Sequence, residues 1–212
     1  MPASPPPADG REWLVTNGLG GYAMGTVAGP PSRSYHGLLI AALAPPVERT
    51  LLVSGLEESV RGLDGDAGGC GPERLVAFAL EGSVPRWRYA WGETLLEKRV
   101  WMAQGANTTY MSYRLERGGP LELTLTAFVQ HRSHHGGERP RLDLVVLPFG
   151  VEVRPAAAAP FFLGSDRGDW RLEDPARWVE GIPLAAEAER GLASTAEHLR
   201  AATLTESLGP LD

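Results

Sequence analysis

The sequence predicts an all-β fold, an antiparallel β-sandwich with little helix. Glycine and proline, 26 and 18 of the 212 residues, make up about a fifth of the chain, against a usual share of about 12%. Between these residues lie short runs that are apolar or alternate between apolar and polar side chains. Many short strands joined by turns are typical of a sandwich.

In the first half of the chain, turn residues separate five expected strands. The first is the apolar run 38–43, and the second follows the turn Ala44-Pro45-Pro46. The later ones are rich in the aromatic and β-branched residues that strands favour. The five expected strands cover residues 38–43, 49–56, 75–80, 86–90 and 94–102.

The second half continues this pattern. Its clearest strand is 121–129, where Leu121, Leu123 and Leu125 alternate with polar residues and should face the core. The sequence Gly118-Gly119-Pro120 before it predicts a hairpin connection. The other expected strands cover residues 108–116, 141–147, 151–154, 161–164 and 203–208.

One segment predicts a helix. Between Ile182 and Leu199, apolar residues recur every three or four positions, with charged residues between them. Gly191 interrupts the segment and weakens the pattern. We therefore expect a single short helix in this part of an otherwise β-rich chain.

The length and composition favour one domain over residues 11–212. Hydrophobic residues make up 43% of the chain, enough for one substantial core. Residues 1–10 are rich in proline and alanine and lack the features of a signal peptide, so a disordered lead-in is expected there. No apolar run approaches the roughly 20 residues that span a bilayer. A cytoplasmic location is the simplest expectation.

Charge and cysteine content narrow the possible partners. The net charge is −6 and no block of basic residues stands out, so neither nucleic acid nor a membrane is expected as a partner. Cys70 is the single cysteine and cannot form an internal disulfide. His131, His134 and His135 lie close together without a matching ligand set, so a solvated loop is favoured over a metal site. We expect no metal and no cofactor.

Residues 17–38 form the most unusual segment. Six of these twenty-two residues are glycine, which indicates positive φ angles or close backbone approaches. The segment lacks the spacing of a nucleotide-binding loop. Its polar and aromatic side chains suit a neutral ligand with many hydroxyl groups. The candidate substrate-binding residues are Trp13, Asn17, Tyr22, Arg33, Tyr35 and His36.

Several of these residues also have a structural interpretation. His36 can bond a sugar hydroxyl or tie its turn to the next strand, and the second role is favoured. Arg33 can bind a ligand or hold the carbonyl groups of the glycine-rich loop. Most of the six tryptophans, which also include Trp87, Trp91, Trp101, Trp170 and Trp178, are expected in the core or at a domain contact.

No catalytic residue can be named from the sequence. Glycoside hydrolysis and transfer need two carboxyl groups about 5–10 Å apart across the scissile bond. Glu57 and Glu58 are adjacent, so on a strand they would face opposite ways. This absence argues moderately against catalysis by the chain alone.

Residues 12–58 contain a long pattern, made of Glu12-Trp13, the glycine-rich residues 17–29, Tyr35-His36-Gly37-Leu38-Leu39 and Leu56-Glu57-Glu58. This pattern resembles the start of bacterial and archaeal glycogen debranching enzymes. It extends more weakly to Phe128, to residues 132–134 and to residues 190–192. Where that family has two arginines before Tyr-His, this chain has Arg33 and Ser34.

The resemblance implies an N-terminal β-sandwich, supersandwich-like, that precedes a larger (α/α)6 barrel. In that family the barrel carries the amylo-α-1,6-glucosidase carboxylates, which have no counterparts in this chain. The implied partners are an α-glucan or maltooligosaccharide and the C-terminal (α/α)6 glucosidase domain. A homodimer through the barrel-facing surface is also an expectation.

Three functions remain open from the sequence. The leading one is an α-glucan-handling domain that shapes the cleft of the glucosidase barrel. The second is 4-α-glucanotransferase activity in the domain itself. The third is a purely structural domain, in which the glycine-rich segment packs on the barrel.

Overall fold

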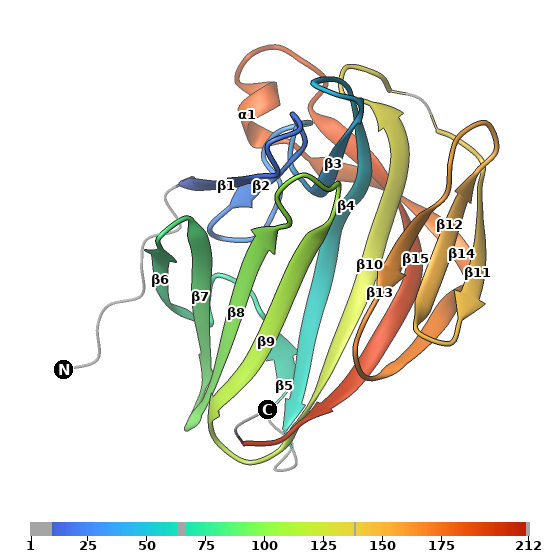
Figure 1. The fold of residues 1–212 in the computed structure, drawn as a ribbon. Coiled ribbons are helices and arrows are strands. Elements are labelled where there is room, and N and C mark those ends of the chain that lie inside the picture. The colour runs from blue at the N-terminus through green and yellow to red at the C-terminus, as the bar shows by residue number, and fades with distance from the viewer. Residues whose placement is uncertain (1–9, 63–66, 138, 211–212) are drawn as a thin grey trace.

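The fold consists almost entirely of antiparallel strands (Figure 1). The computed structural model describes residues 10–62, 67–137 and 139–210, so the expected lead-in lies outside them except for Gly10. The strands are β1 (Glu12–Thr16), β2 (Tyr22–Thr26), β3 (Gly37–Ala44), β4 (Val47–Gly62), β5 (Ala67–Gly69), β6 (Leu75–Glu81), β7 (Val84–Trp91), β8 (Thr94–Met102), β9 (Thr109–Arg117), β10 (Leu121–Ser133), β11 (Leu142–Leu147), β12 (Gly150–Pro155), β13 (Phe161–Gly164), β14 (Asp169–Pro183) and β15 (Thr195–Leu208).

These strands form three sheets. The largest has eight strands in the order β1-β2-β3-β4-β10-β15-β14, with β5 paired to β4. A four-stranded sheet has the order β6-β7-β8-β9, and a three-stranded sheet the order β11-β12-β13. In Figure 1 the four-stranded sheet lies on one flank of the large sheet and the three-stranded sheet on the other. The predicted all-β sandwich is confirmed.

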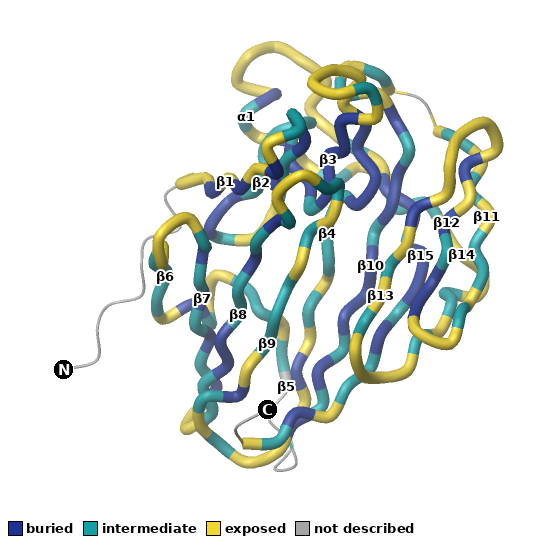
Figure 2. The backbone as a smooth tube through the Cα atoms, in the orientation of Figure 1, coloured by how far each residue is buried: buried dark blue, intermediate teal, exposed yellow. Residues whose placement is uncertain are grey.

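One hydrophobic core joins the sheets. In β7 every second residue is buried, which directs Trp87, Tyr89 and Trp91 inward. In β10 the predicted inward residues Leu121, Leu123 and Leu125 are all buried. Figure 2 shows the buried backbone positions running along these strands and the exposed ones at the connecting loops. The period of two along each strand therefore fixes which face meets the core.

Each strand expected from the sequence is present, most of them a few residues longer than predicted. The connection Gly118-Gly119-Pro120 was misassigned, because it does not close a hairpin. β9 pairs with β8 in the four-stranded sheet, whereas β10 pairs with β4 and β15 in the large sheet. These three residues therefore carry the chain from one layer of the sandwich to the other.

The prediction of a helix between Ile182 and Leu199 was largely wrong. Only α1 (Ala185–Ala188) is helical, and it is the single helix in the described part of the chain. Gly191, at φ 71°, helps to end this turn. Beyond it, Leu199 pairs with Val129 on one side and Trp178 on the other, so hydrogen bonds to two neighbouring strands override the helical spacing. None of the described helices is long and apolar enough to span a membrane.

The sequence also gave no indication of β1, β2, β5 or β14. β14 contains Pro175 and ends at Pro183, and it lies at the edge of the large sheet. A proline is tolerated there because an edge strand leaves some of its N–H groups unpaired.

A buried ion pair crosses from the large sheet to the four-stranded sheet. The Nζ atom of Lys98 lies 2.5 Å from Oε1 of Glu58, and the two side chains are 14% and 7% exposed. The hydroxyl of Tyr113 donates to the same oxygen at 2.5 Å. Lys98 also lies 5.3 Å from the centre of the Trp87 ring. Two residues of the four-stranded sheet, Lys98 and Tyr113, thus bond one carboxylate of the large sheet.

Replacing Lys98 by methionine should leave the Glu58 carboxylate buried without its counter-ion. We expect the free energy of unfolding to fall by about 3–5 kcal/mol, since an uncompensated buried charge is costly. Urea denaturation of the variant measures this loss.

The double variant Glu58→Leu/Lys98→Met is the matched control. It removes both charges, and we expect it to recover most of the lost stability. A Lys98→Met variant that loses less than about 1 kcal/mol would show that the pair does not couple the sheets.

Candidate functional site

The glycine-rich segment is organised around the buried side chain of Asn17. Its Oδ1 atom accepts hydrogen bonds from the backbone N–H groups of Leu19 and Gly21, at 2.9 and 3.1 Å. Its Nδ2 atom donates to the Ala106 carbonyl at 3.0 Å and to Asn107 Oδ1 at 2.8 Å. All four bonds of the amide are therefore made within the protein, and Asn17 has no exposed surface.

Gly21 is required by this arrangement. A Cβ atom at this position would lie 2.7 Å from Asn17 Nδ2 and 2.8 Å from Asn107 Oδ1. The backbone can pass over the asparagine only because the side chain is missing. This explains one of the six glycines as a close approach within the chain.

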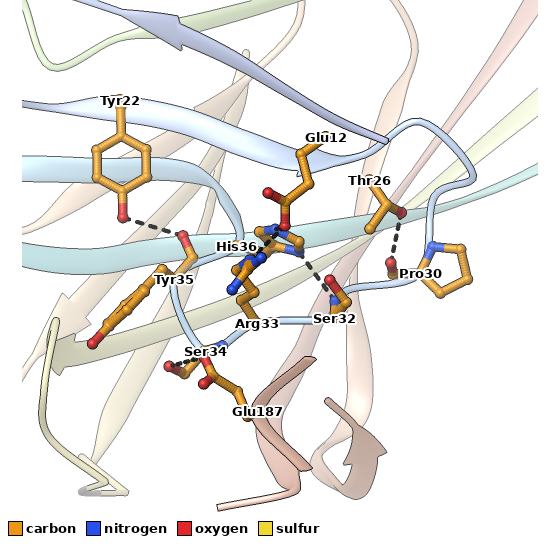
Figure 3. Close-up of polar contacts among 10 residues, drawn as sticks. All are labelled: Glu12, Tyr22, Thr26, Pro30, Ser32, Arg33, Ser34, Tyr35, His36 and Glu187. Atoms are coloured by element: carbon orange, nitrogen blue, oxygen red, sulfur yellow. Dashed lines mark hydrogen bonds and ion pairs between the residues drawn. The ribbon is translucent and has the colours of Figure 1, made fainter. Parts of the chain in front are cut away.

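Glu12, Arg33 and His36 form a polar group at the entrance to β3 (Figure 3). Glu12 Oε1 accepts from Arg33 Nε at 2.6 Å and lies 3.0 Å from His36 Nε2. The backbone N–H of Ser32 donates to His36 Nδ1 at 3.1 Å. Since an N–H can only donate, Nδ1 carries no proton, and the neutral ring donates from Nε2 to Glu12.

The pKa values in this group follow from burial and from these partners. Burial lowers the pKa of His36, although Glu12 acts in the opposite direction. Burial alone would raise the pKa of Glu12, but Arg33 and His36 outweigh it and the pKa is lowered. His36 therefore holds its turn as a neutral ring, which is the structural role favoured by the sequence.

Ser34 fixes the other side of the same turn. Its backbone N–H and its hydroxyl both donate to Glu187 Oε1 at 3.0 Å, as Figure 3 shows. The N–H of Ala186 donates to the Ser32 carbonyl at 3.0 Å, which attaches α1 to this loop. The serine that replaces an arginine of the family pattern thus bonds the buried carboxylate of Glu187.

Tyr22 and Tyr35 contact the loop after β10. The Tyr22 hydroxyl lies 2.6 Å from His134 Nε2 and donates to the Tyr35 carbonyl at 3.2 Å. The Tyr35 ring stacks on His134 with ring centres 4.3 Å apart. Burial raises the pKa of Tyr22 to about 12 and lowers that of His134 to about 4. His134 is thus part of an aromatic cluster, whereas the sequence favoured a solvated loop.

A cleft of about 470 Å³ lies between the large and four-stranded sheets. Both sheets contribute to it, and more than half of its lining comes from the segment 12–58. The lining consists of residues 24–31, 36–38, 54–58 and 69–72 together with Trp13, Trp87, Tyr89, Lys98, Phe128, Val179, Ile182 and His198. A volume of this size is within the range of ligand-binding pockets.

The predicted site residues do not all meet in this cleft. Trp13 and His36 line it, whereas Asn17, Tyr22, Arg33 and Tyr35 do not. The indole of Trp13 is buried, with its ring centre 5.4 Å from that of Trp87 in an edge-on contact. The sequence-based candidates therefore divide into residues that shape the loops and residues that line the cleft.

His198 is a cleft residue that the sequence did not indicate. It is 7% exposed, and its Nδ1 atom has no hydrogen-bond partner among the described residues. Burial and the charge of Arg132 lower its pKa to about 4. The sequence did not indicate His198 because the segment 182–199 predicted a helix, whereas the structure places this residue in the strand β15.

The carboxylates of the cleft are bonded within the protein. Glu57 and Glu58 face opposite ways, as predicted: Glu57 lies 3.2 Å from Arg200, and Glu58 bonds Lys98 and Tyr113. Burial raises the pKa of the Cys70 thiol in the same cleft, which disfavours the reactive thiolate. The described ranges contain no group of three or more metal-ligating side chains.

Exchanging the Asn17 amide for a carboxylate tests its structural role. In Asn17→Asp the new oxygen faces two acceptors, the Ala106 carbonyl and Asn107 Oδ1. We expect a loss of about 1–3 kcal/mol in the free energy of unfolding. Chemical denaturation measures it, and Gln104→Glu, the same exchange at an exposed amide bonded to the Thr16 carbonyl, is the control. Equal losses in the two variants would argue against the role of Asn17.

His198 also makes stability depend on pH. Between pH 6.5 and about 4 the unfolded chain protonates this histidine, whereas the folded chain keeps it neutral. Stability therefore falls as the pH is lowered through this range, by about 3 kcal/mol for this group. The variant His198→Leu should show a correspondingly shallower decline in unfolding experiments across the range. An unchanged pH dependence would contradict the assignment.

The comparisons with known proteins agree with the resemblance of the segment 12–58. A family model described as "Glycogen debranching enzyme N terminal" matches residues 11–212. No curated protein and no solved structure matches the chain. The family match spans β1 to β15 and both sheets that form the cleft. The chain therefore belongs to the family of glycogen debranching enzyme N-terminal domains.

Proposed function

We propose that this domain handles α-glucan for a glycogen debranching enzyme, by forming one side of the substrate-binding cleft of an (α/α)6 glucosidase domain. The observation that carries the proposal is the position of the family's motif. The segments 24–31, 36–38 and 54–58 lie on or beside the neighbouring strands β2, β3 and β4, and together they line one cleft. The other motif residues, such as Asn17 and His36, hold these segments in place through internal hydrogen bonds.

Binding fits the cleft better than catalysis does. Transfer of an α-1,4-glucan segment requires a carboxylate nucleophile and a second carboxyl group as acid and base. Glu58 is bonded to Lys98 and Tyr113, and Glu57 to Arg200. Glucanotransferase activity within this domain is therefore the less supported alternative. The proposed role needs no metal or cofactor, and we place it in the cytoplasm.

A second candidate function is packing on the barrel, and the apolar side chains of the cleft favour it. These side chains are partly exposed, and they come from five strands of the large sheet: Met24, Leu38, Leu56, Phe128 and Ile182. Exposed apolar surface of this kind is typical of a contact with another domain. Without the barrel, the same surface could join two copies of the chain.

A side chain placed at Gly55 should separate these possibilities. Gly55 lines the cleft, its backbone does not have a positive φ, and a Cβ there meets no atom within 4 Å. The variant Gly55→Phe therefore occupies the cleft without displacing the fold. If glucan binds there, affinity for maltoheptaose in isothermal titration calorimetry should fall about tenfold or more.

Gly119→Phe is the matched control, because Gly119 also has open space at Cβ but lies outside the cleft. Equal maltoheptaose affinity in the Gly55→Phe, Gly119→Phe and unmodified chains would contradict glucan binding in the cleft. If Gly55→Phe instead weakens only binding of the separately produced barrel domain, the packing function is supported.

A further inference from the structure

The outward face of the four-stranded sheet carries a ladder of paired charges. Alternation along β7, β8 and β9 directs four arginines outward, and three of them have a carboxylate partner. Arg88 lies 2.7 Å from Glu116, and Arg99 lies 2.7 Å from Glu97 and 2.9 Å from Glu81. Arg86 contacts both Glu81 and Glu97.

Arg114 is the exception on this face. It lies opposite Glu97 in the register of β8 and β9, but both oxygens of Glu97 are occupied by Arg99 and Arg86. The exposed guanidinium of Arg114 has no hydrogen-bond or ion-pair partner within the described ranges. The hydroxyl of Ser112, two residues away on the same strand, is also without one.

These unpaired groups line a hollow that the ring of Trp101 also borders. The hollow has a volume of about 570 Å³ and is lined by Val84, Glu97, Arg99, Trp101, Ser112 and Arg114. Tyr110 stacks on Trp101, with ring centres 5.5 Å apart and planes within 18°. Tyr110 does not line the hollow, so it supports the indole from one side while Trp101 borders the open space.

We propose that this hollow is a second saccharide-binding site, separate from the cleft, in which a glucosyl unit of an α-glucan packs on Trp101. Its hydroxyl groups would bond the guanidinium of Arg114 and the hydroxyl of Ser112, the two polar groups of the hollow that have no partner in the described part of the protein. The combination of one aromatic surface with several fixed polar groups suits a ring that has apolar C–H faces and polar edges. This inference rests on the proposed function for the class of ligand, an α-glucan, and on the geometry of the hollow for everything else.

The charges on this face nearly balance, which suits a neutral ligand. Four outward arginines lie among three outward carboxylates, those of Glu81, Glu97 and Glu116, so the net excess is a single positive charge. Burial would raise the pKa of Glu97, but Arg99 and Arg86 outweigh it and keep the group ionised. An ionised carboxylate beside the hollow disfavours phosphate.

Binding of maltoheptaose to variants of the full chain tests the second site. Trp101→Ala and Arg114→Gln should each weaken binding at this face about tenfold, and they should abolish the shifts that the sugar causes in the amide signals of β8 and β9. Arg61→Gln is the matched control, because Arg61 is an exposed strand arginine that lines neither the hollow nor the cleft. Tyr110→Phe keeps the supporting ring and should bind normally.

The outcomes separate this site from the cleft. If Trp101→Ala loses the sugar-induced amide shifts of β8 and β9 and Gly55→Phe keeps them, the second site is supported. This holds whether or not sugar also binds in the cleft. Sugar-induced shifts confined to the cleft residues would overturn the second site and leave the proposed function standing. Shifts of β8 and β9 with sodium phosphate but not with maltoheptaose would also overturn it, because they would indicate an anion site.

Discussion

The structure depends on how the eight-stranded sheet buries its apolar face. A four-stranded sheet packs against it and shares one hydrophobic core, within which Lys98 reaches across to Glu58. Burying this ion pair costs desolvation, which the close contacts with Glu58 offset. A smaller sheet cannot cover a larger one completely, and the cleft is the gap that remains between the two layers.

The glycine-rich segment shapes this gap by its own internal bonds. Asn17 folds residues 17–21 back on themselves, and His36 fixes the turn before β3 as a neutral ring. Tyr22 and Tyr35 attach the segment to His134, more than ninety residues away in the sequence. The residues that suggested a ligand thus act mainly on the shape of the cleft, and its surface is formed by the residues between them.

The sequence predicted much of the fold because strands leave a local signal. The alternation of Leu121, Leu123 and Leu125 identified β10. The spacing of apolar residues before Leu199 resembled a helix by chance, because Leu199 lies in β15, a strand that is hydrogen-bonded to a neighbour on each side. The roles of the polar residues were harder to predict, since an asparagine in a glycine-rich loop suits a ligand and a backbone amide equally well. The partners of Asn17, Ala106 and Asn107, lie about ninety positions away and leave no local pattern.

We infer that the glucan contacts the cleft and not the side chains of the glycine-rich loop. Hydrogen–deuterium exchange of the chain with and without maltoheptaose tests it most directly. We expect slower exchange of the amides of residues 28–31 and 55–57 when the sugar is present, and no change at residues 17–21 and 33–35. Protection at Asn17, Tyr22 or Tyr35 with none in the cleft would contradict this account.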